Sequence, residues 1–234
     1  SSISAFKWIP LIEDEHRESF EKSASIELGL PFTIKQHLYN GQIITSATKA
    51  SYLPTYYTYP LNHNESALGL DLLSHQATKI TMEQALTLNS AVASPPLILV
   101  QDDHLNPAVL IFYPVLNKPS LTPYVVSKVK KLKSLTGYVM VIVQFDAIYN
   151  YIKGLETLSN IQVVVQDISV KEPFLLYGNE IEGNDRLSRV ITFDAFKRKY
   201  LINISEAQPW INQEKGLKIW ITLFGLVIGG FIFQ

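Results

Sequence analysis

The feature that most constrains this chain is an apolar run over residues 219–233, which contains no charged residue. The run is apolar on every face and includes Gly225, Gly229 and Gly230, a composition that suits a membrane helix better than a soluble one. At about 1.5 Å per residue, it covers only part of a hydrocarbon core roughly 30 Å thick. We therefore expect residues 213–234 to form the start of a transmembrane helix. The alternative is a buried C-terminal helix.

Composition restricts what the rest of the chain can do. Hydrophobic residues make up 47% of the 234 residues, which is enough to build one large domain or two small ones. The formal net charge of -1 leaves no basic excess to neutralise phosphates, so we expect no nucleic-acid partner. The sequence has no cysteine, which excludes disulfides, thiolate zinc sites and a cysteine nucleophile.

Helical and strand-like patterns alternate, which predicts an α/β (α+β) fold. Residues 13–28 begin with acidic side chains and stop at Gly29, as a helix does. Residues 75–88 follow Ser74, a favourable N-cap, and predict a second helix. Short connections favour antiparallel sheets. The stretches that we expect to be strands are residues 1–10, 32–37, 42–48, 96–101, 108–115, 137–145, 161–168, 174–177, 189–193 and 200–205, with further helices at 127–135 and from Asp146.

These patterns divide the chain into two units of unequal size before the apolar run. We expect residues 1–147 to form a larger first unit and residues 148–212 to form a smaller second unit nearer the membrane. Residues 213–234 then begin the membrane helix.

Motifs for catalysis are missing from the sequence. The five histidines lie at no metal-ligand spacing, and neither HExxH, GxSxG nor a glycine-rich phosphate loop occurs. We therefore expect no catalytic residue, no metal and no cofactor. Asp102, Asp103 and His104 form the tightest polar cluster, which is typical of a solvated turn, with a metal or ligand contact as the alternative.

Asp71 is the acidic residue that stands out, because it interrupts the apolar residues 67–73 just before a predicted helix. A carboxylate in such surroundings is expected to be partly buried and to need a charge or hydrogen-bond partner. Two interpretations remain open. Asp71 bonds the backbone amides at the start of the next helix, or it faces a pocket and accepts hydrogen bonds from a ligand.

The sequence NESALGLDLLS at residues 64–74 resembles the central motif of CHASE domains. These are the extracytoplasmic sensors of plant cytokinin receptors and of many bacterial histidine kinases and diguanylate cyclases. Other pieces occur in the family's order: FKWIP at 6–10, RESFE at 17–21, LP at 53–54, YP at 59–60, AS at 93–94, LILVQ at 97–101, FYPV at 112–115 and GYVMVIVQFD at 137–146.

The resemblance implies two PAS-like units with antiparallel sheets, the membrane-distal one holding the ligand. It gives Asp71 the role of binding the nitrogen atoms of an adenine-type ligand. Leu72 and Leu73 follow, where the plant receptors carry methionines, so the pocket wall differs. The ligand-binding residues that we expect besides Asp71 are Tyr59, Ala93, Ser94, Leu99, Asp103 and Phe112.

The function implied by the resemblance is that of a small-molecule sensor and not of an enzyme. The domain would lie in the periplasm or outside the cell, anchored in the cell membrane by its C-terminal helix. As a homodimer, it would pass ligand occupancy to a cytoplasmic kinase or cyclase. The alternative is a scaffold or protein-interaction ectodomain that binds no ligand. An empty cavity beside Asp71 would favour sensing, and a collapsed one would favour the scaffold.

Overall fold

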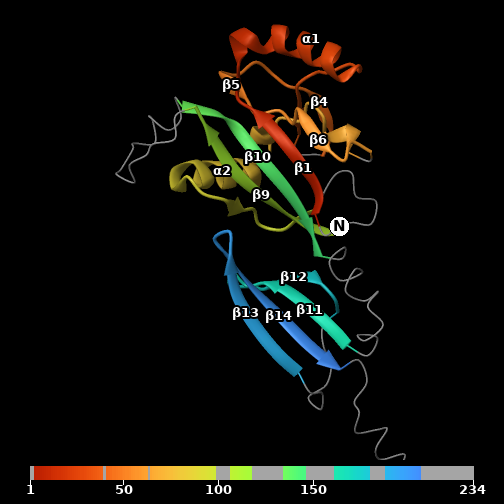
Figure 1. The fold of residues 1–234 in the computed structure, drawn as a ribbon, viewed down its shortest axis with the longest axis vertical. Coiled ribbons are helices and arrows are strands. Elements are labelled where there is room, and N and C mark those ends of the chain that lie inside the picture. The colour runs from red at the N-terminus through yellow and green to blue at the C-terminus, as the bar shows by residue number, and fades with distance from the viewer. Residues whose placement is uncertain are drawn as a thin grey trace, which may run out of the picture.

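The computed structural model describes residues 3–38, 41–62, 64–98, 106–117, 134–145, 161–179 and 188–206. Within these ranges the chain forms mostly antiparallel sheets and few helices, so the predicted α+β class is confirmed (Figure 1). The division into two PAS-like units stays a prediction. Across the described ranges, no helix is long and apolar enough to span a membrane. The predicted membrane helix at residues 213–234 lies outside them.

A six-stranded antiparallel sheet is the largest element of the fold. The strand order is β6-β1-β10-β9-β7, and β8 pairs with β9 beside this path. The three long strands at its centre are the sequence-predicted strands near residues 1–10, 108–115 and 137–145. The strands are β1 (Ile3–Pro10), β6 (Tyr57–Tyr59), β7 (Val92–Ala93), β8 (Leu97–Ile98), β9 (Pro107–Leu116) and β10 (Leu135–Gln144).

One face of this sheet packs against α2 (Gln76–Leu88). Alternate side chains of each strand point to this face and form a core with the helix. Met82, Ala85 and Leu86 of α2 are buried in the resulting core. The Tyr138 hydroxyl donates a hydrogen bond to the Met82 carbonyl oxygen at 3.0 Å, which fixes the helix to β10. The sheet residues in this core are Ala5, Ile9, Val92, Ala108, Leu110, Phe112, Leu135, Tyr138, Met140 and Ile142.

The N-terminal helical region, predicted at residues 13–28, consists of a 3-10 turn η1 (Asp14–His16) and the helix α1 (Arg17–Leu28). Gly29 ends α1 in the left-handed conformation, at φ 66°, as the sequence predicts. Beneath α1, aromatic and aliphatic side chains form a second core. Two small sheets lie nearby: β2 (Ile12–Glu13) pairs with β5 (Ser51–Tyr52), and β3 (Lys35–His37) pairs with β4 (Ile43–Thr45).

The C-terminal part of the described chain is a four-stranded antiparallel sheet in the order β12-β11-β14-β13. Its strands match the four predicted there: β11 (Ile161–Asp167), β12 (Phe174–Tyr177), β13 (Ser188–Ala195) and β14 (Arg198–Glu206). Phe196 and Lys197 form the β13–β14 turn with φ of 50° and 66°, the backbone of a two-residue hairpin turn. The Oδ2 atom of buried Asp167 accepts a hydrogen bond from Arg198 Nε at 2.5 Å, and this ion pair connects β11 to β14.

The two large sheets contact each other directly, with the four-stranded sheet below the six-stranded one in Figure 1. Ala93 and Val109 of the upper sheet are buried in one cluster with Val165 and Tyr200 of the lower sheet. The Ala93 N–H donates a hydrogen bond to the Phe196 carbonyl oxygen at 2.9 Å. The β13–β14 turn is therefore attached to the edge strand β7.

The start of α2 differs from the prediction, which made Ser74 its N-cap. A 3-10 turn, η3 (Leu72–Ser74), intervenes, and α2 begins at Gln76 with no side-chain cap. The Ser74 hydroxyl instead donates to the Asp71 carbonyl oxygen at 2.6 Å and accepts from the His37 N–H at 3.2 Å. The short strands β2, β5, β6 and β7 lie outside the stretches predicted to be strands. The predicted helix from Asp146 lies outside the described residues, as does nearly all of that at residues 127–135, whose last residue belongs to β10.

Candidate functional site

A cavity of about 650 Å³ lies between the inner face of the six-stranded sheet and the start of α2. Its size falls within the usual range for small-molecule sites, roughly 300–1,000 Å³. The described residues that line it are Lys7, Gln36, His37, Leu38, Gly41, Lys49, Thr55, Ala67, Leu70, Asp71, Leu72, Ser74, His75, Gln76, Thr78, Leu97, Ile98, Leu110, Met140 and Ile142.

Asp71 lies in the wall of this cavity and is completely buried. Its Oδ2 is 2.6 Å from Lys49 Nζ, and the Lys49 side chain is 31% exposed. Its Oδ1 accepts hydrogen bonds from the Leu53 N–H at 2.9 Å and the Leu73 N–H at 3.1 Å. The expected buried carboxylate with a charge partner is thus present, and so is the expected bond to the backbone of the next helical turn.

The segment around Asp71 is held between two other parts of the backbone. On one side, the Asp71 N–H donates to the Lys35 carbonyl oxygen at 2.8 Å. On the other, the Leu72 N–H donates to the Leu53 carbonyl oxygen at 3.1 Å. Gly69 allows the segment to pass this close to the neighbouring backbone. Its φ is 76°, and a Cβ at this position would lie only 2.1 Å from the Thr33 carbonyl oxygen.

Lys7 enters the same cavity from the sheet. It lies on the inner face of β1 between the buried residues Ala5 and Ile9, and only 5% of it is exposed. Its ammonium group has no ion-pair or hydrogen-bond partner within the described part of the chain. Burial lowers the pKa of Lys7 from 10.5 to about 8, so the group is still mainly protonated at neutral pH.

Two imidazoles, those of His37 and His75, also line the cavity. The pKa of His37 is lowered by burial and then by the positive charge of His75. Among the described residues, neither ring makes a hydrogen bond. Two further polar side chains of the wall are already bonded within the protein. The Gln36 Oε1 accepts a hydrogen bond from the Ser46 hydroxyl at 3.2 Å, and the Thr78 hydroxyl donates to the carbonyl oxygens of Leu72 and His75 before α2.

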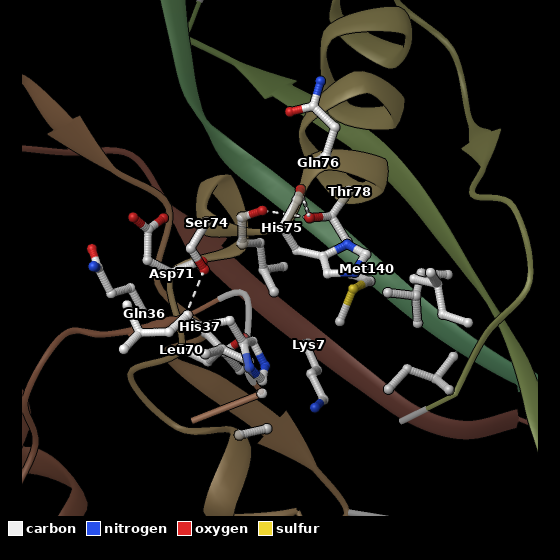
Figure 2. A pocket seen from close by; sticks show the side chains of 18 of the residues that line it. Lys7, Gln36, His37, Leu70, Asp71, Ser74, His75, Gln76, Thr78 and Met140 are labelled. Atoms are coloured by element: carbon white, nitrogen blue, oxygen red, sulfur yellow. Dashed lines mark hydrogen bonds between the residues drawn. The ribbon is translucent and has the colours of Figure 1, made fainter. Parts of the chain in front are cut away.

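The described lining therefore carries more positive than negative charge. Asp71 is its one carboxylate, and that carboxylate is matched by Lys49, which leaves Lys7 unbalanced. Figure 2 shows Lys7 extending from β1 into the cavity, whereas the Asp71 carboxylate is directed away from it. Elsewhere in the described chain, Glu13, Glu15 and His16 bring their ligand atoms within 4.8 Å of one another, but all three are exposed.

The structure does not bring all the predicted ligand-binding residues together. Asp71 lines the cavity, but Tyr59 is 75% exposed on β6 and outside the described lining. Phe112 is buried in the core against Tyr138, with ring centroids 6.4 Å apart. Ala93 and Ser94 are buried at the sheet edge. Leu99 and Asp103 lie outside the described residues. A ligand-binding role for these six residues stays a prediction.

Ser94 illustrates how a predicted pocket residue is used by the fold. Its hydroxyl donates to the Pro95 carbonyl oxygen at 2.7 Å and accepts from the Leu110 N–H at 3.1 Å. Sequence reasoning missed Lys7, Lys49, His37 and His75. For Lys7 the signal is incomplete, because strand alternation places it on the same face as Ala5 and Ile9 but does not tell which face of the strand is inside.

Comparison with known proteins identifies one family. The model of the CHASE domain matches residues 1–177, a range that contains every described residue of the cavity wall. No curated protein matches the chain.

Proposed function

We propose, because this chain belongs to the CHASE domain family, that it is the ligand-sensing domain of a membrane-bound receptor and binds its ligand in the cavity beside Asp71. The CHASE domain is an extracellular sensor domain of signalling receptors and is not catalytic. The ligand, the transmembrane helix at residues 213–234 and a cytoplasmic kinase or cyclase as output are part of this proposal.

The observation that carries the proposal is the cavity itself. It combines apolar walls, such as Leu110 and Met140, with the polar groups of Lys7, His37 and His75, which have no bonding partner among the described residues. A mainly apolar hollow with a few directed polar groups is the usual construction of a small-molecule site. A scaffold that binds no ligand would be expected to fill this space with its own side chains.

Signal transfer in this proposal runs from the cavity through α2 and β7 to the lower sheet. A ligand acts by binding one of two arrangements more tightly than the other. The α2 helix covers the cavity and leads into β7, which is bonded to the β13–β14 turn through Ala93. Strand β14 precedes the apolar residues 219–233 in the sequence. The two sheets, as PAS-like units, would pass a small shift toward the membrane.

A binding screen with a blocked cavity tests the proposal. The 234-residue chain, in mild detergent, is tested by thermal shift against purines, amino acids and organic acids, with adenine among the purines. Ile142→Trp fills the cavity from β10, and Val139→Trp adds the same ring on the opposite, exposed face of that strand. We expect ligands to stabilise the wild type and Val139→Trp but not Ile142→Trp.

Circular dichroism establishes that both variants are folded before they are compared. A compound that stabilises Ile142→Trp as strongly as the wild type binds elsewhere and contradicts the proposed site. Failure of the whole panel to stabilise the wild type contradicts the proposal for these classes of compound.

A further inference from the structure

The cavity contains a buried cation that has no counter-charge among the described residues, and from this we propose that its ligand is a small organic anion whose negative group binds the Lys7 ammonium. The inference rests on the proposed function, because it names the class of molecule that the cavity would take. In this inference the ligand makes its main polar contact with Lys7 on β1 and not with Asp71.

The position of Lys7 fits a binding group and not a structural one. Its register neighbours are Met140 on β10 and Thr58 on β6, whose side chains share its face of the sheet. Neither neighbour offers a charge. The Thr58 hydroxyl is itself buried with no hydrogen-bond partner in the described chain. Two polar groups on adjacent strands thus lack a hydrogen-bond partner in the described chain on the same face of the sheet, and of the two only Lys7 lines the cavity as described.

A buried ammonium of this kind is unfavourable unless something compensates it. Lysine donates up to three hydrogen bonds and accepts none, so the compensating atom must be an acceptor, and an anionic acceptor binds most strongly. The protein supplies none among its described residues, and the cavity gives a ligand room to do so.

Asp71 is not available as that acceptor or as the main anchor for a ligand. Its carboxylate is 2.6 Å from Lys49 Nζ and also accepts two backbone hydrogen bonds. In Figure 2 it is directed away from Lys7. A ligand with ring N–H donors would have to displace these bonds, whereas a ligand with a negative group meets Lys7 without displacing anything.

The remaining wall indicates what the anion is attached to. His37 and His75 add two further nitrogen groups without partners in the described chain, and both can donate to an anion. The side chains near the sheet are otherwise apolar, among them Leu110, Met140 and Ile142. This combination fits a monocarboxylate with an aliphatic or aromatic body and disfavours an amine, which would place a second cation beside Lys7.

Matched acids and amides test the inference on the wild-type chain. Benzoate is compared with benzamide, and hexanoate with hexanamide and hexylamine, by isothermal titration calorimetry at pH 7. A charge-assisted hydrogen bond adds about 1.5–3 kcal/mol, so we expect each acid to bind about 10–100 times more tightly than its amide. Hexylamine is expected not to bind.

Variants locate the charge that is recognised. Lys7→Met is expected to reduce the affinity for the acids by about 10–100 times and to leave that for the amides nearly unchanged. Lys22→Met removes an exposed lysine of α1 and is expected to change neither affinity. Because the acid–amide comparison uses the wild type, it remains decisive even if Lys7→Met is poorly folded.

The inference and the proposed function fail in different ways. If amides bind as tightly as acids, or if Lys7→Met keeps full affinity for the acids, the anion inference is overturned. Binding of adenine but no acid, abolished by Ile142→Trp, overturns the anion inference and leaves the sensor function standing. Binding that Ile142→Trp does not affect overturns both.

Discussion

Replacing Lys7 by methionine should make the empty domain more stable, although it removes a charged group. Methionine keeps most of the length and apolar volume of the lysine stem and lies beside Met140, another flexible apolar side chain. The lowering of the Lys7 pKa from 10.5 to about 8 corresponds to about 3 kcal/mol of unfavourable free energy for holding the charged form. Because water entry and relaxation reduce this penalty, we expect a gain of about 1–3 kcal/mol at pH 7.

The pH dependence of this gain identifies its cause. Between the folded pKa of about 8 and the unfolded value of 10.5, Lys7 is neutral in the native state and protonated in the unfolded state. The unfolded state then binds more protons, so wild-type stability rises with pH over this window. The advantage of Lys7→Met is therefore fully present below pH 8 and is lost as the pH rises toward 10.5.

Urea unfolding at pH 7 and pH 10 measures the effect, with each variant compared with the wild type at the same pH so that other titrating groups cancel. For a chain of this size, a gain of 1 kcal/mol also raises Tm by about 2–4 °C. Lys22→Met, at an exposed position, is expected to stay within about 0.5 kcal/mol of the wild type. The reasoning is refuted if Lys7→Met is less stable than the wild type at pH 7, or if its advantage does not change with pH.

Three further predictions concern the wall of the cavity and its link to the lower sheet. Asp71→Ala should destabilise the fold by about 2–4 kcal/mol, because it strands the buried Leu53 N–H and a lysine partner; a loss below 1 kcal/mol in urea unfolding would contradict this. Gly69→Ala should cost at least about 3 kcal/mol in the same assay, because a Cβ would lie 2.1 Å from a backbone oxygen at a φ of 76°; near-wild-type stability would exclude the described backbone path. Ligand binding should slow hydrogen exchange of the Ala93 amide, which is bonded to the Phe196 carbonyl oxygen; exchange that changes only around the cavity would argue against transfer through β7.

Local patterns predicted much of the fold. The end of α1 at Gly29 and the four strands of the lower sheet follow from turn residues and alternation within a few positions of the chain. Local patterns did not predict the start of α2 correctly. Ser74 does not cap this helix, because its hydroxyl bonds instead to the Asp71 carbonyl oxygen and the His37 N–H. Propensity favours serine at a cap, but tertiary contacts decide where its hydroxyl bonds.

The candidate site was predictable only in part. Asp71 stood out because a charge amid apolar residues must find a partner, but the partner, Lys49, lies 22 positions away and no local pattern connects them. Lys7 was hidden for another reason. Both faces of β1 are largely apolar, with Phe6 and Trp8 on one and Ala5 and Ile9 on the other, so alternation alone does not tell which face is inside.

The bonds made by Asp71 have a consequence for the rate and cost of ligand capture. Its carboxylate joins two stretches of chain by bonds within the protein itself: the segment that contains Lys49 and Leu53, and the turn at Leu73 that follows Asp71. These stretches have already lost their conformational entropy during folding, so an incoming molecule need not order them. The binding site should therefore be preformed, so that ligand association requires no slow folding step and the occupied fraction follows the ligand concentration.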